Sequence, residues 1–230
     1  MFFQPLNWKL ATSSNLVPPS SRLREAGQPK GHSDRAGILL HGRSRTKQEM
    51  INLTKALDVG GTRWLAPYAG RGLWYPGRYM DTRESNEPQL TRSVERVHWL
   101  VLDGAEGGRL GPEHIFIVGF SQGACTAVEY VLRHPSSVAA IVVFTGCLIG
   151  PSGTKWTTAG GQSLKGVSVF LTGSDADEWI DPARTQETAN VLTDLGAHVE
   201  LHMYPGRPHV ICPEELAAAR TFLERTIGDI

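Results

Sequence analysis

The sequence predicts an α/β protein, with one domain built on a mostly parallel sheet that carries helices on both faces. Short apolar runs of strand length alternate with segments in which apolar residues recur at helical spacing. The short runs are apolar throughout and rich in β-branched and aromatic residues, which is typical of parallel strands buried on both faces. The chain has 230 residues, 40% of them hydrophobic. That length suits one core better than two.

The expected strands and helices alternate in chain order. The runs of strand length cover residues 38–40, 64–66, 115–118, 140–144, 167–171 and 199–204. Apolar residues at helical spacing occupy residues 50–57, 90–101, 124–131, 189–192 and 216–227. Pro213 followed by two glutamates is typical of a helix start, and Gly196 of a helix end. This alternation favours helices as crossover connections between parallel strands.

The N-terminal segment has a different composition. Residues 11–34 are rich in serine, proline, glycine and charge, and they can bury little apolar area. We therefore expect residues 1–34 to form an arm, partly extended or loop, with one edge strand as an option. Residues 35–230 form the single folded domain, without an internal repeat.

Charge and composition exclude several classes of protein. The chain has 23 lysine and arginine residues and 23 aspartate and glutamate residues, so its formal net charge is zero. No long-range electrostatic field therefore favours binding to nucleic acid or to an acidic membrane surface. Apolar runs fall short of the roughly 20 residues that a membrane span needs. The first residues lack the pattern of a signal peptide. The three cysteines, Cys125, Cys147 and Cys212, are too widely spaced for a zinc or disulfide framework, and they predict reduced thiols in a cytoplasmic protein.

Gly119-Phe120-Ser121-Gln122-Gly123 is a G-x-S-x-G pentapeptide. Chance alone yields roughly 0.17 such matches in a chain of this composition, so the motif by itself is weak. Its context is specific, because an apolar strand ends at Val118 and a helical pattern begins at Gln122. Strand, tight turn and helix are what a nucleophilic serine needs to stand clear of the sheet. We therefore expect Ser121 to be a nucleophile.

A serine nucleophile needs a histidine as base and an acid to orient that histidine. Parallel sheets bind ligands beyond the carboxyl ends of their strands, and His209 follows the last strand. The acid should follow the preceding strand, where both Asp175 and Asp177 are candidates. His198 and His202 do not form a metal site, because four residues of strand separate them by about 13 Å.

Acyl transfer also needs backbone N–H groups directed at the developing oxyanion. Gln122 follows the nucleophile at a helix N-terminus and supplies one. The turn after the strand at 38–40 supplies the other, for which we choose Arg43. His41, in the same turn, is expected to be structural, since His209 is the better base.

These residues resemble the phospholipase/carboxylesterase family of α/β-hydrolases, which includes the acyl-protein thioesterases. The resemblance runs from about residue 25 to residue 227. The segments that carry it are Leu40-His41-Gly42-Arg43, Ala66-Pro67, Trp74-Tyr75-Pro76, Asn86-Glu87-Pro88, Gly119 to Ala124, and Tyr204-Pro205-Gly206 with His209. It implies an α/β-hydrolase fold and an esterase with Ser121 as nucleophile, His209 as base and no cofactor.

Two positions depart from the family pattern. The acid loop D-P-x-V-P of the family is here Asp177-Glu178-Trp179-Ile180-Asp181, with Pro182 one position later. Asp177 aligns best as the acid, and Asp175 remains its rival. Ser44 stands where relatives with the His-Gly-Arg pattern tend to have glycine, which makes the oxyanion turn less free to bend.

The segments around the expected site indicate the size of the substrate. Residues 146–166 are too few and too irregular for a large lid domain, so we expect an open site. The predicted apolar wall consists of Trp74, Tyr75, Leu148, Ile149 and Trp179, with core packing as the alternative for the aromatic residues. An open, modestly apolar cleft suits small to medium carboxylic esters, including aryl esters.

The leading interpretation is a serine carboxylesterase acting on a small-molecule ester. An acyl-thioesterase or lysophospholipase is the alternative in the same reaction class. A non-catalytic binding module is disfavoured, because serine, histidine and acid are all present. The sequence leaves monomer and homodimer open.

Overall fold

The computed structural model describes residues 23–57 and 59–227. Within them the chain forms a seven-stranded sheet in the order β1-β3-β2-β4-β5-β6-β7. The strands are β1 (Leu23–Gly27), β2 (Arg35–Leu40), β3 (Thr62–Pro67), β4 (Ile115–Phe120), β5 (Ala140–Phe144), β6 (Ser168–Gly173) and β7 (His198–Met203). β1 pairs antiparallel with β3, and the other pairings are parallel. The predicted α/β fold is confirmed.

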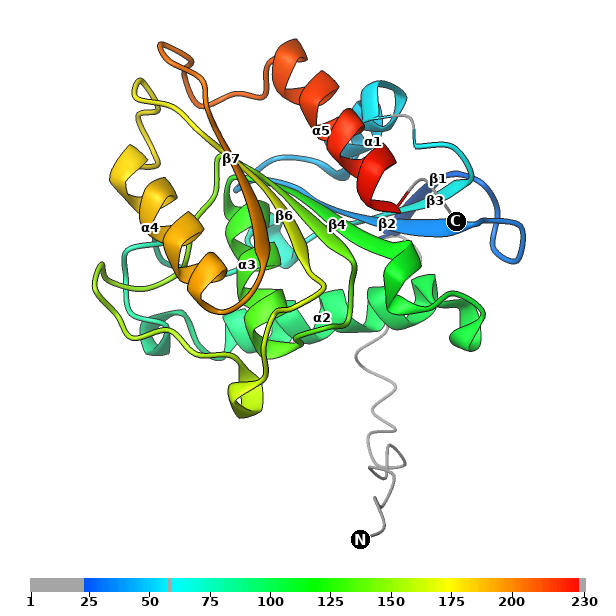
Figure 1. The fold of residues 1–230 in the computed structure, drawn as a ribbon, viewed down its shortest axis with the longest axis horizontal. Helices are drawn as coiled ribbons and strands as arrows, with labels where there is room; N and C mark the ends of the chain where they lie inside the picture. The colour runs from blue at the N-terminus through cyan, green and yellow to red at the C-terminus, as the bar shows by residue number, and fades with distance from the viewer. Residues whose placement is uncertain (1–22, 58, 228–230) are drawn as a thin grey trace, which may run out of the picture.

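Five α-helices of the described chain cover the two faces of this sheet (Figure 1). They are α1 (Lys47–Leu57), α2 (Gln89–Gly104), α3 (Gln122–Arg133), α4 (Pro182–Asp194) and α5 (Pro213–Ile227). One apolar cluster joins one sheet face to α2, α3 and α4, and a second joins the other face to α1 and α5. Successive side chains of a strand point to opposite faces of the sheet, so one strand contributes to both clusters. Ile38 and Leu40 of β2 enter the first, and Leu39 between them enters the second.

The central strands are buried more deeply than the edge strand β7. Every residue of β4 and β5 is buried, whereas β7 is only half-buried. The carboxyl ends of β4, β6 and β7 lead into the loops that carry the predicted Ser121, Asp175/Asp177 and His209. The parallel register therefore brings these three loops to one edge of the sheet.

Two long connections complete the surroundings of this edge. Residues 68–88 contain two short 3₁₀ turns, Gly70–Gly72 and Glu84–Asn86. Residues 145–167 contain one, Ala159–Gly161, and form no helical lid. Of the arm expected for residues 1–34, residues 23–27 form β1, and residues 1–22 lie outside the described part of the chain. Within the described residues, no helix is long and apolar enough to cross a membrane.

Candidate active site

Ser121 occupies a sharp turn between β4 and α3. Its φ of 53° lies in the left-handed region, which an ordinary residue adopts only when the surroundings hold it there. The Ser121 N–H donates to the carbonyl of Phe144 at 2.9 Å, and its own carbonyl accepts from Cys125 N–H at 3.0 Å. These two bonds fix the turn and direct the hydroxyl away from the sheet.

The glycines on either side of Ser121 are needed because neighbouring backbone lies very close. A Cβ atom at Gly119 would lie 2.5 Å from the Cα of Ala124, and one at Gly123 would lie 2.2 Å from the carbonyl oxygen of Leu40. Both distances are too short for any side chain. The G-x-S-x-G spacing thus lets β2, β4 and α3 pack together beneath the serine.

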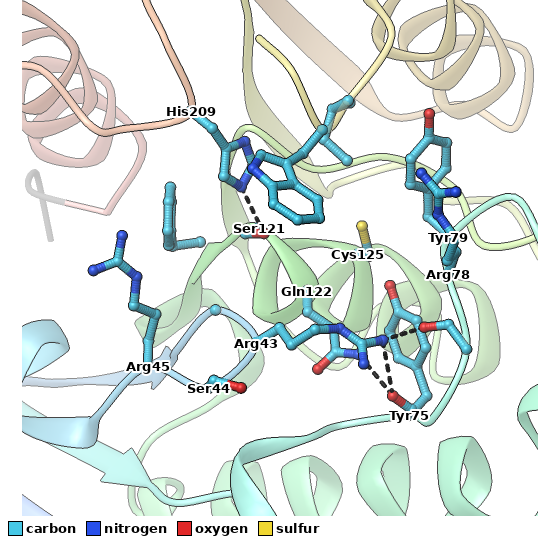
Figure 2. Close-up of a pocket in the computed structure, with 15 residues that line it drawn as sticks. Arg43, Ser44, Arg45, Tyr75, Arg78, Tyr79, Ser121, Gln122, Cys125 and His209 are labelled. Carbon is cyan, nitrogen blue, oxygen red and sulfur yellow. Dashed lines mark hydrogen bonds between the residues drawn. The ribbon is translucent and has the colours of Figure 1, made fainter.

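The structure brings His209 and Asp177 to Ser121. His209 Nε2 lies 2.8 Å from Ser121 Oγ (Figure 2). Its Nδ1 lies 2.8 and 2.9 Å from the two carboxylate oxygens of Asp177. The side chain of Asp177 is almost fully buried, at 1% exposure, and that of His209 is 11% exposed. This geometry can take a proton from the serine hydroxyl and stabilise the resulting imidazolium.

The two candidate acids have different partners. Asp175 Oδ1 accepts the N–H of Gly206 at 2.7 Å and stabilises the loop after β7 without reaching the imidazole. Asp177 Oδ1 also accepts the N–H groups of Trp179 and Ile180 at 2.8 and 3.0 Å. With these contacts the Asp177 carboxylate lies against His209.

The environment keeps Asp177 ionised. Burial alone would raise the pKa of its carboxyl group. The hydrogen bonds from His209, Trp179 and Ile180 outweigh burial and hold the pKa of Asp177 below its ordinary value. A carboxylate with this pKa accepts the Nδ1–H of His209 and leaves Nε2 free of a proton and facing Ser121.

The loop that carries His209 rests on a buried ion pair. Arg207 donates to the carbonyls of Pro208 and Val210, on either side of His209. Its guanidinium lies 3.3 Å from Glu215 of α5, and the two side chains are 6% and 0% exposed. Glu215 also accepts from the Thr172 hydroxyl and from Cys212 N–H. His209 is therefore positioned by α5 and the end of β6 as well as by its own loop.

The two predicted oxyanion donors lie on opposite elements at the same cavity. Gln122 is the first residue of α3, where helix geometry leaves its N–H without an intrahelical acceptor. Arg43 follows β2 and lines the same cavity. The side chains of both residues hold the segment after β3. Gln122 accepts from Trp74 N–H and donates to the carbonyl of Tyr75, and Arg43 donates to the carbonyls of residues 75–77.

His41 is structural, and both of its ring nitrogens are engaged. Nδ1 lies 2.7 Å from the Gly42 carbonyl and Nε2 lies 3.0 Å from Ala69 N–H, which fixes a neutral ring with the proton on Nδ1. Burial lowers the pKa of His41 and favours the same neutral form. The adjacent Ser44 has a φ of 57°, a conformation that suits glycine, so this turn is bent despite its serine.

A cavity of about 370 Å³ opens at Ser121. Of the predicted wall, Tyr75 and Trp179 line it. Trp74, Leu148 and Ile149 do not, so these three do not belong to the predicted wall, and for Trp74 the alternative of core packing applies. Trp74 is buried, with its indole N–H on the His41 carbonyl, and Leu148 and Ile149 pack in the core.

Other lining residues were not singled out for this role from the sequence. They include Arg45, Arg78, Phe120, Cys125 and Ile180. Phe120 stands inside the serine motif, and Cys125 follows Ser121 by one helical turn, so their positions carried a usable signal. In Figure 2 the sulfur of Cys125 lies between Ser121 and Tyr79.

The parallel sheet, the serine turn between β4 and α3 and the loops after β6 and β7 define an α/β-hydrolase. The chain matches the Phospholipase/Carboxylesterase family over residues 27–227, and it belongs to that family. A crystal structure of a phospholipase/carboxylesterase from Dyadobacter fermentans superimposes with a TM-score of 0.79 at 31% identity, covering 90% of this chain and 96% of that one.

Curated relatives carry names from the same family. Acyl-protein thioesterase 1 of Mycosarcoma maydis is 31% identical over 153 residues, covering 62% of this chain and 63% of that protein. A probable carboxylesterase of Oryza sativa subsp. japonica is 29% identical over 139 residues, covering 60% of this chain and 58% of that protein. The chain thus spans less than two thirds of the length of these two relatives.

Proposed function

We propose that this protein is a serine carboxylesterase that hydrolyses small to medium carboxylic esters. The observation that carries the proposal is the chain of hydrogen bonds from Ser121 through His209 to Asp177, beside a cavity that Ser121 and His209 line. The family membership supports ester hydrolysis as the reaction. The cavity volume, near the lower end of the range for ligand pockets, supports a substrate of modest size.

In the proposed first half-reaction, Ser121 Oγ attacks the carbonyl carbon of the ester and His209 Nε2 takes the hydroxyl proton. The N–H groups of Gln122 and Arg43 stabilise the negative oxygen of the tetrahedral intermediate. The C–O bond to the alcohol then breaks, and the alcohol leaves with the proton from His209. Asp177 remains ionised throughout and stabilises the imidazolium.

The acyl group is then an ester of Ser121. In the second half-reaction a water molecule gives its proton to His209 Nε2 and attacks the acyl carbon. The acyl–serine bond breaks, and Ser121 recovers its proton from His209. The acid is released and the enzyme returns to its starting state.

A thioesterase is the second candidate, and the relative named acyl-protein thioesterase 1 is the observation that favours it. Thioesters react by the same two half-reactions with a thiol as leaving group. The comparison of kcat/KM for short 4-nitrophenyl esters with kcat/KM for palmitoyl thioesters distinguishes the candidates. We expect the short esters to be the better substrates.

The test of the catalytic proposal is labelling by a fluorophosphonate together with the Ser121→Ala variant. We expect the wild-type protein to form a covalent adduct on Ser121 and to hydrolyse 4-nitrophenyl esters. Ser121→Ala should keep the fold, lose the label and fall to the residual rate that oxyanion donors and binding provide. Turnover close to wild type in a folded Ser121→Ala protein would exclude Ser121 as the nucleophile.

A further inference from the structure

Arginine side chains gather on the walls of the cavity at Ser121. Arg43, Arg45 and Arg78 line it, and among its described lining residues there is no aspartate or glutamate. The chain as a whole has equal numbers of acidic and basic residues. The positive charge is therefore a local property of this cavity, where it attracts anions.

Two of these arginines already have partners. The guanidinium of Arg43 is hydrogen-bonded to the carbonyls of residues 75–77. Arg45, just before α1, lies 3.5 Å from Glu49 in the first turn of that helix. Arg43 thus holds the cavity wall, and the charge of Arg45 is balanced by its neighbour.

Arg78 differs from both. Its guanidinium makes no hydrogen bond or ion pair within the part of the chain that the structure describes, and the side chain is exposed. The carboxylates of Asp81 and Glu178 accept backbone N–H groups instead. Asp81 accepts Arg78 N–H at 2.6 Å, and Glu178 accepts His209 N–H at 3.2 Å. Arg78 therefore presents a bidentate donor for an anion.

The position of Arg78 indicates where the anion would lie on a substrate. In Figure 2, Arg78 and Tyr79 lie on the far side of Cys125 from Ser121. Ser121 and Cys125 are one turn of α3 apart, which is about 6 Å along the helix axis. An extended chain advances about 1.2 Å per bond, so a spacer of about five bonds is the shortest that carries a group from a carbonyl carbon at Ser121 past Cys125.

The intervening walls suit a methylene spacer. Tyr75, Tyr79 and Ile180 line the cavity, and all three are buried residues of largely apolar character. The rings of the two tyrosines and the Ile180 side chain offer apolar surface, against which a polar spacer would lose part of its hydration. Arg78 and these apolar walls together favour an ester that is charged at the end remote from its carbonyl group, and uncharged in between.

We propose, building on the esterase function above, that the preferred substrates are esters that carry a carboxylate about five bonds from the ester carbonyl carbon. Arg78 binds that carboxylate and selects these esters over neutral ones. Tyr75, Tyr79 and Ile180 enclose the apolar spacer.

Matched ester pairs test this proposal. On the acyl side, mono-4-nitrophenyl adipate has its carboxylate carbon five bonds from the ester carbonyl carbon, and 4-nitrophenyl hexanoate is the neutral ester of equal length. On the alcohol side, 4-acetoxybutanoate is compared with butyl acetate. We expect kcat/KM of the wild-type enzyme to be about tenfold higher for the anionic ester in one of the pairs, as for one charge-assisted contact in a partly dry cavity. Added salt should reduce this preference.

Variants assign the preference to Arg78. Arg78→Gln should lower the ratio of anionic to neutral kcat/KM about tenfold, and Arg78→Lys should retain part of it. Arg92→Gln, which removes an exposed positive charge from α2 outside the cavity, should leave the ratio unchanged. A wild-type enzyme that hydrolyses the neutral esters without an anionic preference, or an unchanged ratio in Arg78→Gln, overturns this inference alone. Failure to hydrolyse any of the four esters instead overturns the esterase proposal.

Discussion

Replacing Asp177 by asparagine tests the proposed role of the acid most sharply. Asp177 Oδ1 accepts the N–H groups of Trp179 and Ile180 as well as facing His209. An asparagine must keep its oxygen on those two donors, which turns its NH₂ group toward His209 Nδ1. Two donors cannot share a hydrogen bond, so the imidazole has to move its proton to Nε2.

A histidine with its proton on Nε2 cannot accept the proton of Ser121. The structure therefore predicts loss of the base without loss of any backbone hydrogen bond at the acid loop. We expect kcat/KM of Asp177→Asn to fall by about 10⁴, as when the orienting carboxylate of a serine hydrolase is removed. That factor corresponds to about 5.4 kcal/mol of transition-state stabilisation.

The assay compares kcat/KM for a short 4-nitrophenyl ester at one pH near neutrality, with circular dichroism to check the fold. Asp175→Asn is the matched control, because its carboxylate only accepts Gly206 N–H and an amide oxygen can replace it. We expect a loss of less than about tenfold for the control. A larger loss in Asp175→Asn than in Asp177→Asn would refute the assignment of the acid.

Two further predictions concern stability. Glu215→Ala leaves the buried Arg207 without its counter-charge. The free energy of unfolding, measured in urea, should therefore fall by about 3–5 kcal/mol. A loss below about 1 kcal/mol would contradict the role of Glu215 as a buried counter-charge. Burial, together with His98 and Arg133, lowers the pKa of His134 to about 4. The unfolded chain therefore binds this proton at higher pH than the folded chain, and stability falls as the pH drops from 6.5 toward 4. Discounted for partial exposure, the loss is about 1–2 kcal/mol. His134→Gln should flatten the acid side of a Tm against pH curve, and an unchanged slope would exclude His134 as the cause.

The sequence was most informative about candidate site residues that directly follow the carboxyl end of a strand. Ser121 and His209, the proposed nucleophile and base, could be singled out because one follows an apolar strand within a glycine turn and the other follows the last strand. The choice between Asp175 and Asp177 rested on a family alignment. Its physical reason is local, since the turn that gives Asp177 the N–H groups of Trp179 and Ile180 also directs its carboxylate to the imidazole.

Sequence pattern could not separate cavity residues from core residues. Leu148 and Ile149 follow β5 at the same edge as the serine, and their apolar character fits a wall or a core equally well. In the structure Arg184 of α4 donates to the carbonyl of Leu148, and a Cβ at Gly146 would lie 2.4 Å from Ala124. These contacts draw the segment beneath α3 and α4, and they depend on packing between distant elements.

Glu215 illustrates the same limit. In sequence, it is one of two glutamates in the first turn of a helix, where an acid favours the helix dipole. In the structure it is fully buried and serves as counter-charge to Arg207. Only the packing of α5 against the end of β6 shows that it also positions the loop of His209.

The order of the reacting groups along the chain has a consequence for biosynthesis. Ser121 and His209 are 88 residues apart, and His209 and Asp177 are 32 apart. A ribosome therefore completes the serine turn long before it adds the base, and contacts of such sequence separation are slow to close. Under the proposed mechanism, the nascent chain would have its nucleophile but no means of activating it. Hydrolysis would begin only after β7 has paired with β6 and α5 has packed beneath the histidine loop, so turnover itself would report the last stage of folding.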